Sequence, residues 1–148
     1  MRDIIRTHVL NSEARNMTTQ ITAEDHALVR TYLLLPMVLT AFERDKRILS
    51  ESAGLRTPGP YVEVVERAMN AVSAELKDIR ATMRKRGVKV YEETRDSVQV
   101  VALYQCRGYH GRFMMLNSFV AAEAGLLMRK YLGLNTRKID AARTTPRP

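Results

Sequence analysis

Cysteine and tryptophan are the scarcest residue types, with one cysteine and no tryptophan among 148 residues. A lone cysteine excludes a disulfide within the chain and any zinc site built on several thiolates. Long apolar runs are missing too. The longest, Tyr32 to Leu39, contains a proline and is far shorter than the roughly 20 residues that cross a bilayer. The first residues, Met1 to Arg6, lack the apolar stretch of a signal peptide, so we expect neither export nor a membrane partner.

Positive charge and apolar residues are what the sequence has in quantity. Lysine and arginine number 24 against 16 aspartate and glutamate, which gives a formal net charge of +8 and a pI near 10.0. Hydrophobic residues make up 45% of the chain, more than a disordered protein carries. The length suits one domain with one hydrophobic core. We therefore expect a small, basic, intracellular protein.

The first long helix is predicted from about residue 22 to residue 51. Thr22 stands three residues before Asp25, which is the spacing of a capping box with aspartate in the place of the usual glutamate. Apolar residues then follow at steps of three, four or seven. Pro36 lies inside this pattern and removes one backbone donor. The pattern favours one kinked helix, and two shorter helices that meet near Pro36 are the alternative.

The second long helix shows the most regular pattern in the chain and follows a turn rich in glycine and proline. Pro60 suits its first turn, and Arg86-Gly87 suits its end. Seven apolar residues recur at alternating steps of three and four, which is typical of a helix packed lengthwise in a bundle or coiled coil. They are Val62, Val65, Met69, Val72, Leu76, Ile79 and Met83.

After Gly87 the apolar period changes from that of a helix to that of a strand. Residues 88–94 and 98–105 read as two strands joined by a tight reversal, because β-branched and aromatic residues alternate with polar ones. A glycine-flanked loop, Arg107 to Arg112, then leads to a last helix over about residues 111–132. An isolated hairpin is barely stable in water, so we expect it to pack on the helices or on a second copy.

These elements predict a mostly α, α+β fold: a bundle of three long helices and a short N-terminal helix over residues 3–15, with one antiparallel β-hairpin at about 88–105 before the last helix. The predicted organisation is an N-terminal extension over 1–21, a single helical domain over 22–133, and a flexible basic tail over 134–148. The regular stripe of the second helix and the apolar last helix also favour self-association, most simply as a dimer.

Basic residues gather in one place, and this is the most informative functional feature. Between Lys77 and Lys89 there are six basic residues and one acidic residue, and the tail adds further arginine and lysine. Such a cluster can neutralise phosphates and release counterions, although a solvated helix end that compensates the dipole would look the same. Two arginines, a tyrosine and a histidine in the loop before the last helix would suit an anion site. The predicted nucleic-acid-binding residues are Lys77, Arg80, Arg84, Lys85, Arg86, Lys89, Arg107, Tyr109, Arg112, Arg137 and Lys138.

Residues of the types used in catalysis have simpler structural interpretations. Cys106 and His110 stand four apart, but zinc needs three or four ligands, and no orienting group for a catalytic thiolate can be identified. We expect a core cysteine at a strand end and a loop histidine. Glu24 and Asp25 fit the helix dipole at an N-terminus, and His26 follows them. We therefore predict no catalytic residue, no metal site and no cofactor.

Four segments of the chain resemble small proteins encoded in phages and prophages of Gram-positive bacteria. These segments are Tyr32-Leu-Leu-Leu-Pro-Met-Val-Leu-Thr-Ala-Phe-Glu-Arg-Asp, Pro60-Tyr-Val-Glu, Val88-Lys-Val-Tyr and Leu127-Met-Arg-Lys-Tyr-Leu. The resemblance covers about residues 22–133 and rests on packing and turn residues. It implies a phage or mobile-element origin, and hence a location in the cytoplasm of the bacterial host or in the virion.

Together these observations favour a non-enzymatic binding or regulatory protein that contacts the phosphate backbone of DNA or RNA. Two other classes of function remain open. The protein could be a structural component of a phage-like particle, or an inhibitor that docks on a host or phage protein. Neighbouring genes would separate them, because virion genes favour assembly and early regulatory genes favour the other roles.

Overall fold

The computed structural model describes residues 20–134, which form three helices and three strands. The elements are α2 (Ala23–Glu51), α3 (Pro58–Arg86), β1 (Val88–Arg95), β2 (Gln99–Cys106), β3 (Tyr109–Leu116) and α4 (Asn117–Tyr131). The short helix predicted over residues 3–15 lies outside the described residues, as does the basic tail from residue 135 onward.

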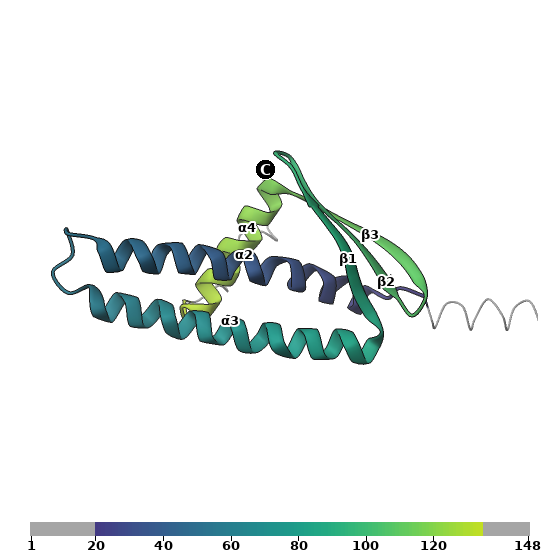
Figure 1. The fold of residues 1–148 in the computed structure, drawn as a ribbon, viewed down its shortest axis with the longest axis horizontal. Helices are drawn as coiled ribbons and strands as arrows, with labels where there is room; N and C mark the ends of the chain where they lie inside the picture. Colours follow the sequence, from purple (N-terminus) through teal and green to yellow (C-terminus); the bar gives the residue numbers. More distant parts are fainter. Residues whose placement is uncertain (1–19, 135–148) are drawn as a thin grey trace, which may run out of the picture.

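Helices α2 and α3 lie side by side and antiparallel, and they form the long axis of the molecule (Figure 1). The regular apolar stripe of α3 faces this contact: Val65, Val72 and Leu76 are buried against α2. Phe42 of α2 is 1% exposed in the same cluster. The stripe predicted from the sequence is therefore a packing face, and its partner is another helix of the same chain.

The helix ends have the structure that their local sequence predicts. The hydroxyl of Thr22 accepts a hydrogen bond from the Asp25 N–H, and the Asp25 carboxylate accepts one from the Thr22 N–H, so the capping box is complete. Helix α2 continues through Pro36, and the alternative of two shorter helices is wrong. Helix α3 ends at Gly87, whose φ of 68° is the left-handed conformation that favours glycine.

The three strands form one antiparallel sheet in the order β1-β2-β3. Side chains of β2 alternate strictly, with every second one buried, and the buried ones include Tyr104 and Cys106. This inner face packs on the first turns of α2, at Val29 and Leu33, and on Met83 near the end of α3. The sheet therefore covers the end of the helix pair where α2 begins and α3 ends (Figure 1).

The predicted bundle of three long helices with a two-stranded hairpin is wrong. Both strands of the hairpin exist, but residues 109–116, predicted as loop and first turns of the last helix, form a third strand paired with β2 along its whole length. Helix α4 consequently has only 15 residues. Phe113 and Leu116 fall within the predicted last helix, but they lie on opposite faces of β3: Phe113 is buried and Leu116 is exposed.

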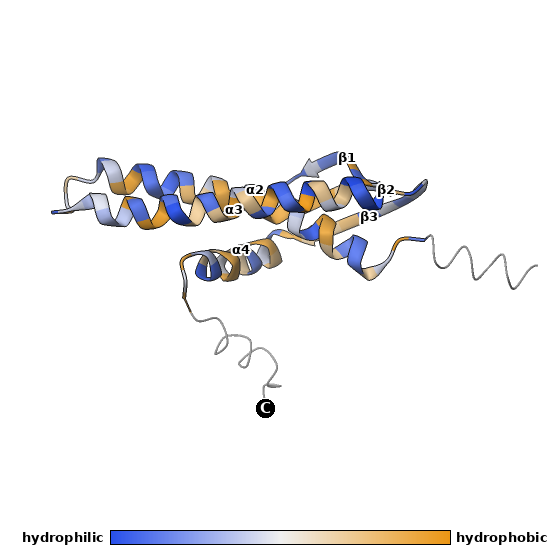
Figure 2. Cartoon of the chain, turned by 90° about the horizontal axis from the view of Figure 1, so that it is seen from below, coloured by the Kyte–Doolittle hydropathy of each residue, from blue (hydrophilic) through white to orange (hydrophobic). Residues whose placement is uncertain are grey.

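Helix α4 crosses α2 and α3 on one side of the pair (Figures 1 and 2). Leu127 and Met128 pack on the cluster between the two long helices, and the Tyr131 hydroxyl donates a hydrogen bond to Glu75 of α3. Burial and the Glu75 carboxylate together raise the pKa of Tyr131. Among the helices of residues 20–134, none has the length and apolar character required to cross a membrane.

Candidate functional site

Asp25 is the one charged residue within 20–134 whose side chain is fully buried, and two arginines enclose it. Arg86 donates from Nε to Asp25 Oδ1 at 2.9 Å, and Arg107 donates from Nη2 to Asp25 Oδ2 at 2.6 Å. Arg107 also donates to the backbone carbonyl of Arg86 at 2.7 Å, and Arg86 pairs with Glu24 at 2.8 Å. This cluster joins the start of α2, the end of α3 and the turn between β2 and β3.

The Asp25 cluster holds its carboxylate in the charged form. Burial by itself raises the pKa of Asp25, but hydrogen bonds from Arg107, the Thr22 backbone and Arg86 outweigh it and hold that pKa well below 3.8. The same carboxylate raises the pKa of both guanidinium groups. Arg86 and Arg107 were predicted to contact phosphate, and the structure places both at this buried carboxylate.

Four other predicted residues converge on one cavity of about 380 Å³ beside β1. The helical residues are Lys77, Arg80 and Arg84 of α3, which are exposed at spacings of three and four, and Lys89 joins them from β1. Helix α3 and strand β1 can share this cavity because the chain reverses direction at Gly87. We call this set the basic cavity.

The basic cavity combines positive charge with an apolar floor. Its remaining lining residues are Tyr32, Met83, Val88 and Val90, so no carboxylate lines it. The guanidinium carbon of Arg80 lies 6.0 Å from the centre of the Tyr32 ring, within range of a cation–π contact. Within residues 20–134, none of the four cationic side chains forms an ion pair. Their charge is therefore available to an anionic ligand.

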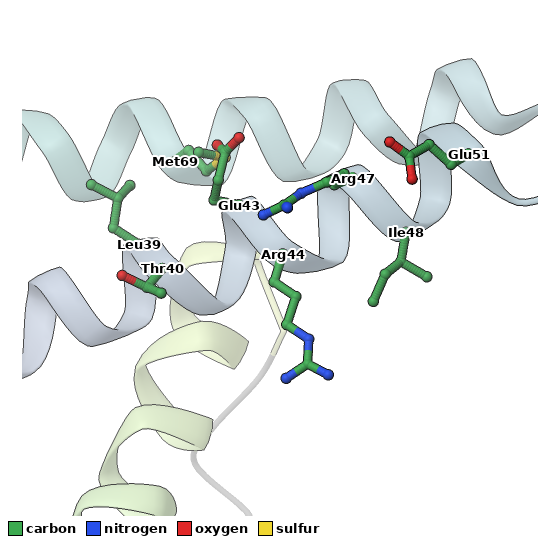
Figure 3. Close-up of a pocket in the computed structure, with 8 residues that line it drawn as sticks. All are labelled: Leu39, Thr40, Glu43, Arg44, Arg47, Ile48, Glu51 and Met69. Carbon is green, nitrogen blue, oxygen red and sulfur yellow. The ribbon is translucent and has the colours of Figure 1, made fainter.

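A larger cavity, of about 760 Å³, lies along the second half of α2 and has a different character (Figure 3). Glu43 and Glu51 balance Arg44 and Arg47 there, and Arg44 points away from α3. Because its formal charges cancel, this cavity offers an anion much less than the basic cavity does. Its two arginines nevertheless provide a matched control for experiments on the basic cavity.

The remaining predicted residues are dispersed. Lys85 is exposed on α3 outside the lining of the basic cavity, Tyr109 begins β3, and Arg112 lies on the outer face of the sheet. Arg137 and Lys138 lie outside the described residues. The predicted anion site at a helix N-terminus is wrong in its structural basis, because Arg107 and Gly108 form a strand-to-strand turn and α4 begins only at Asn117.

Cys106 and His110 lie on opposite faces of the sheet. Cys106 is completely buried on the inner face, as the sequence predicted, and burial raises the pKa of its thiol. His110 is in strand β3 rather than in a loop, and on the outer face its Nδ1 lies 3.2 Å from the Tyr91 hydroxyl. The two side chains cannot act together. Within residues 20–134, no three histidine, cysteine, aspartate or glutamate side chains are grouped so that they could hold a metal ion.

Sequence reasoning missed two participants. Asp25 was interpreted as a residue that caps α2, which it is, but its second role depends on Arg86 and Arg107 from distant parts of the chain. Tyr32 belongs to the longest apolar run of the sequence, and only the position of β1 places it in the basic cavity. The sequence shows Asp25 at the start of one predicted helix and Arg86 at the end of the other. No local pattern indicates that these two residues form an ion pair.

Fold and cavity together define a small basic protein in which a three-stranded antiparallel sheet covers one end of a long helical hairpin. The family model described as "YhjD protein" matches residues 20–136, and the chain belongs to this family. It is 27% identical over 109 residues to "Uncharacterized protein YhjD" of Bacillus subtilis (strain 168), which covers 74% of this chain and 90% of that protein. No solved structure matches the chain. The prediction that the chain resembles a family of proteins from Gram-positive bacteria is confirmed. The phage origin of that family stays a prediction.

Proposed function

We propose that the protein binds nucleic acid through its phosphate backbone, at the basic cavity. The observation that carries this proposal is the convergence of Lys77, Arg80, Arg84 and Lys89 on one concave surface whose lining includes no carboxylate. Arginine offers planar pairs of donors that match phosphate oxygens, and lysine supplies a compact positive charge. Four cations on one surface can follow successive phosphates.

The apolar floor supports the same proposal. Nucleic acid presents sugars and base edges beside its phosphates, and a cavity with Tyr32 and Met83 at its base can contact them while the cations bind the backbone. The contacts to phosphate carry no base sequence information. We therefore propose that binding depends more on salt concentration than on nucleotide sequence.

The experiment is a fluorescence-anisotropy titration of duplex DNA, single-stranded DNA and RNA between 50 and 200 mM salt. Four phosphate contacts at the basic cavity contribute about −3.6 to the slope of log affinity against log salt on duplex DNA. Replacing Arg80 and Arg84 together by Gln removes two contacts and flattens that slope by about 1.8. Both side chains are exposed, so the fold should persist, which circular dichroism checks.

The matched control is the double variant Arg44→Gln with Arg47→Gln, which removes the same charge from the mixed cavity of Figure 3. It should leave the slope within about 0.5 of wild type. If both double variants weaken binding equally, binding follows net charge and the basic cavity is not the site. If the wild-type chain binds none of the three nucleic acids with a salt dependence, the proposed function is wrong.

Several finer expectations stay predictions: a phage or mobile-element origin, a non-enzymatic role, and a location in the bacterial cytoplasm or the virion. The two rival functions, a component of a phage-like particle and a docking inhibitor, also stay open. Mapping the neighbouring genes tests the origin and the rivals together. A setting among early regulatory genes would favour nucleic-acid binding or inhibition, whereas virion genes would favour assembly.

A further inference from the structure

The outer face of the sheet carries an apolar centre that no helix covers within residues 20–134. Along β2, Val101 and Leu103 are half-buried and lie opposite to the side chains that enter the core. On β3, Met114 and Leu116 are 48% and 49% exposed, and Tyr91 of β1 is 48% exposed. Neighbouring apolar residues at a surface, framed by polar ones, mark interaction sites.

The helices do not offer a comparable surface for self-association. The regular apolar stripe of α3 favoured a dimer in the sequence analysis, but it packs against helices of the same chain. Val72 is 0% exposed and Leu76 is 6% exposed against α2 and α4. The last helix also turns its apolar side, at Leu127, toward that cluster. The outer face of the sheet, in contrast, is not used by any packing contact between elements within residues 20–134, and its exposed apolar residues lie on neighbouring strands.

Two opposite charges flank the apolar centre symmetrically. In the register of the sheet, Glu92 of β1 and Arg112 of β3 both lie beside Leu103 of β2, one on each side. Two strand spacings separate them, or about 9.6 Å. Within residues 20–134, neither side chain forms an ion pair with any other residue. Beside Leu103 the face thus carries one unpaired acid and one unpaired base at equal distances from its central strand, and Lys89 lies further along β1 on the same face, beside Gln105.

We propose that two copies of the chain stack through these outer faces, with the two-fold axis parallel to β2. This axis places β1 of one copy over β3 of the other, so that Glu92 faces Arg112 twice across the interface and Leu103 faces Leu103. A two-fold axis in the plane of the sheet but perpendicular to β2 would instead oppose like charges. The charge pattern therefore selects one of the two symmetric arrangements, and stacked sheets of this kind keep their strands within about 30° of each other.

The face is small, which favours a weak and reversible dimer. Three strands at about 4.8 Å and eight residues at about 3.3 Å give a face of roughly 14 by 26 Å, which is a small interface. We therefore expect a reversible dimer with a dissociation constant in the micromolar range, observable by sedimentation equilibrium. Lys77, Arg80 and Arg84 of the basic cavity lie on α3 and take no part in this contact, so the oligomeric state tests the dimer independently of nucleic-acid binding.

The first arm of the experiment reverses each charge singly in the full chain. Arg112→Glu and Glu92→Arg each convert two attractive contacts into two repulsive ones, and each should weaken dimerisation about thirtyfold. The control is Arg67→Glu, an equal charge reversal at an exposed position of α3, which should leave the dissociation constant unchanged. Circular dichroism confirms that each variant is folded.

The second arm mixes the two single variants. Arg112→Glu makes one copy acidic at both positions, and Glu92→Arg makes the other basic at both, so the proposed axis pairs opposite charges at both contacts of a mixed dimer. Two variants that are mainly monomeric alone should therefore form a heterodimer at least as tight as the wild-type dimer. A monomeric wild-type chain, single reversals without effect, or a mixture that stays monomeric would each overturn the proposal.

Discussion

Replacing Asp25 by asparagine tests the role of the buried carboxylate while almost preserving its shape. The wild-type carboxylate accepts from Arg86 on one oxygen at 2.9 Å and from Arg107 on the other at 2.6 Å. Asparagine has one acceptor oxygen, and its NH₂ group would turn a donor toward a guanidinium group that can only donate. One arginine therefore loses its hydrogen bond to residue 25, and the other binds a neutral oxygen there instead of a charged one.

The size of the effect is set by the interactions that are lost, reduced by the water that can reach the two arginines. A hydrogen bond to a charged group contributes about 1.5–3 kcal/mol, and breaking a buried ion pair costs about 3–5 kcal/mol. The side chains of Arg86 and Arg107 are 33% and 30% exposed, so water can partly solvate them once the carboxylate is gone. We therefore expect the free energy of unfolding to fall by about 3 kcal/mol at pH 7, at the lower end of that range.

Urea unfolding followed by circular dichroism measures this change, with Glu24→Gln as the matched control. Glu24 is the neighbouring residue and also pairs with Arg86, but its side chain is 77% exposed. An exposed pair contributes at most about 1 kcal/mol, so the control variant should lose much less than Asp25→Asn. If Asp25→Asn costs less than about 1 kcal/mol, or no more than the control, the buried cluster does not stabilise the fold as argued.

Acidification gives a second test of the same carboxylate. Because the native pKa of Asp25 lies below the unfolded value of about 3.9, its contribution is fully present above that value and is lost as the pH falls toward the native pKa. The difference in unfolding free energy between wild type and Asp25→Asn should therefore be constant from about pH 7 to 5 and shrink below about pH 4. A difference that grows on acidification would contradict this sign.

Two further pairs of variants test the packing, both by urea unfolding. Gly111→Ala should cost about 1–3 kcal/mol because its Cβ would lie 2.5 Å from the buried Tyr104 ring, whereas Gly125→Ala, with open space around it in α4, should stabilise by about 0.5–1 kcal/mol. Phe42→Ala should cost about 3–5 kcal/mol, since Phe42 is 1% exposed, and Ile48→Ala, at 55% exposure, within about 0.5 kcal/mol. Equal effects within either pair would refute the corresponding argument.

Strand β3 shows why the sheet could not be predicted completely. Its inner residues Phe113 and Met115 alternate with Met114 and Leu116, which are apolar as well, so the period of two that identifies a strand is erased. The spacing of Phe113, Leu116 and Val120 fits a helix equally well. The outer residues need to be polar only if that face meets water, so the feature that misled the prediction also motivates the proposed dimer.

The local elements were determined by the sequence itself. The capping box of Thr22 and Asp25, the apolar stripe of α3 and the stop at Gly87 act within one or two helical turns, so neighbouring residues suffice to predict them. The accumulation of positive charge between Lys77 and Lys89 is equally local. These signals placed both long helices and the first two strands close to their observed bounds.

Only the tertiary structure decided how those basic residues divide. Arg86 is only two residues from Arg84 in the sequence. Arg86 nevertheless pairs with Asp25, while Arg84 lines the basic cavity together with Lys89. The division depends on contacts between distant residues, because Asp25 meets Arg86 across 61 residues and Arg107 across 82 residues of the chain. The sequence by itself determines how charge is distributed along the chain. The position of one buried carboxylate, Asp25, decides that Arg86 forms an ion pair while Arg84 stays free to bind a ligand.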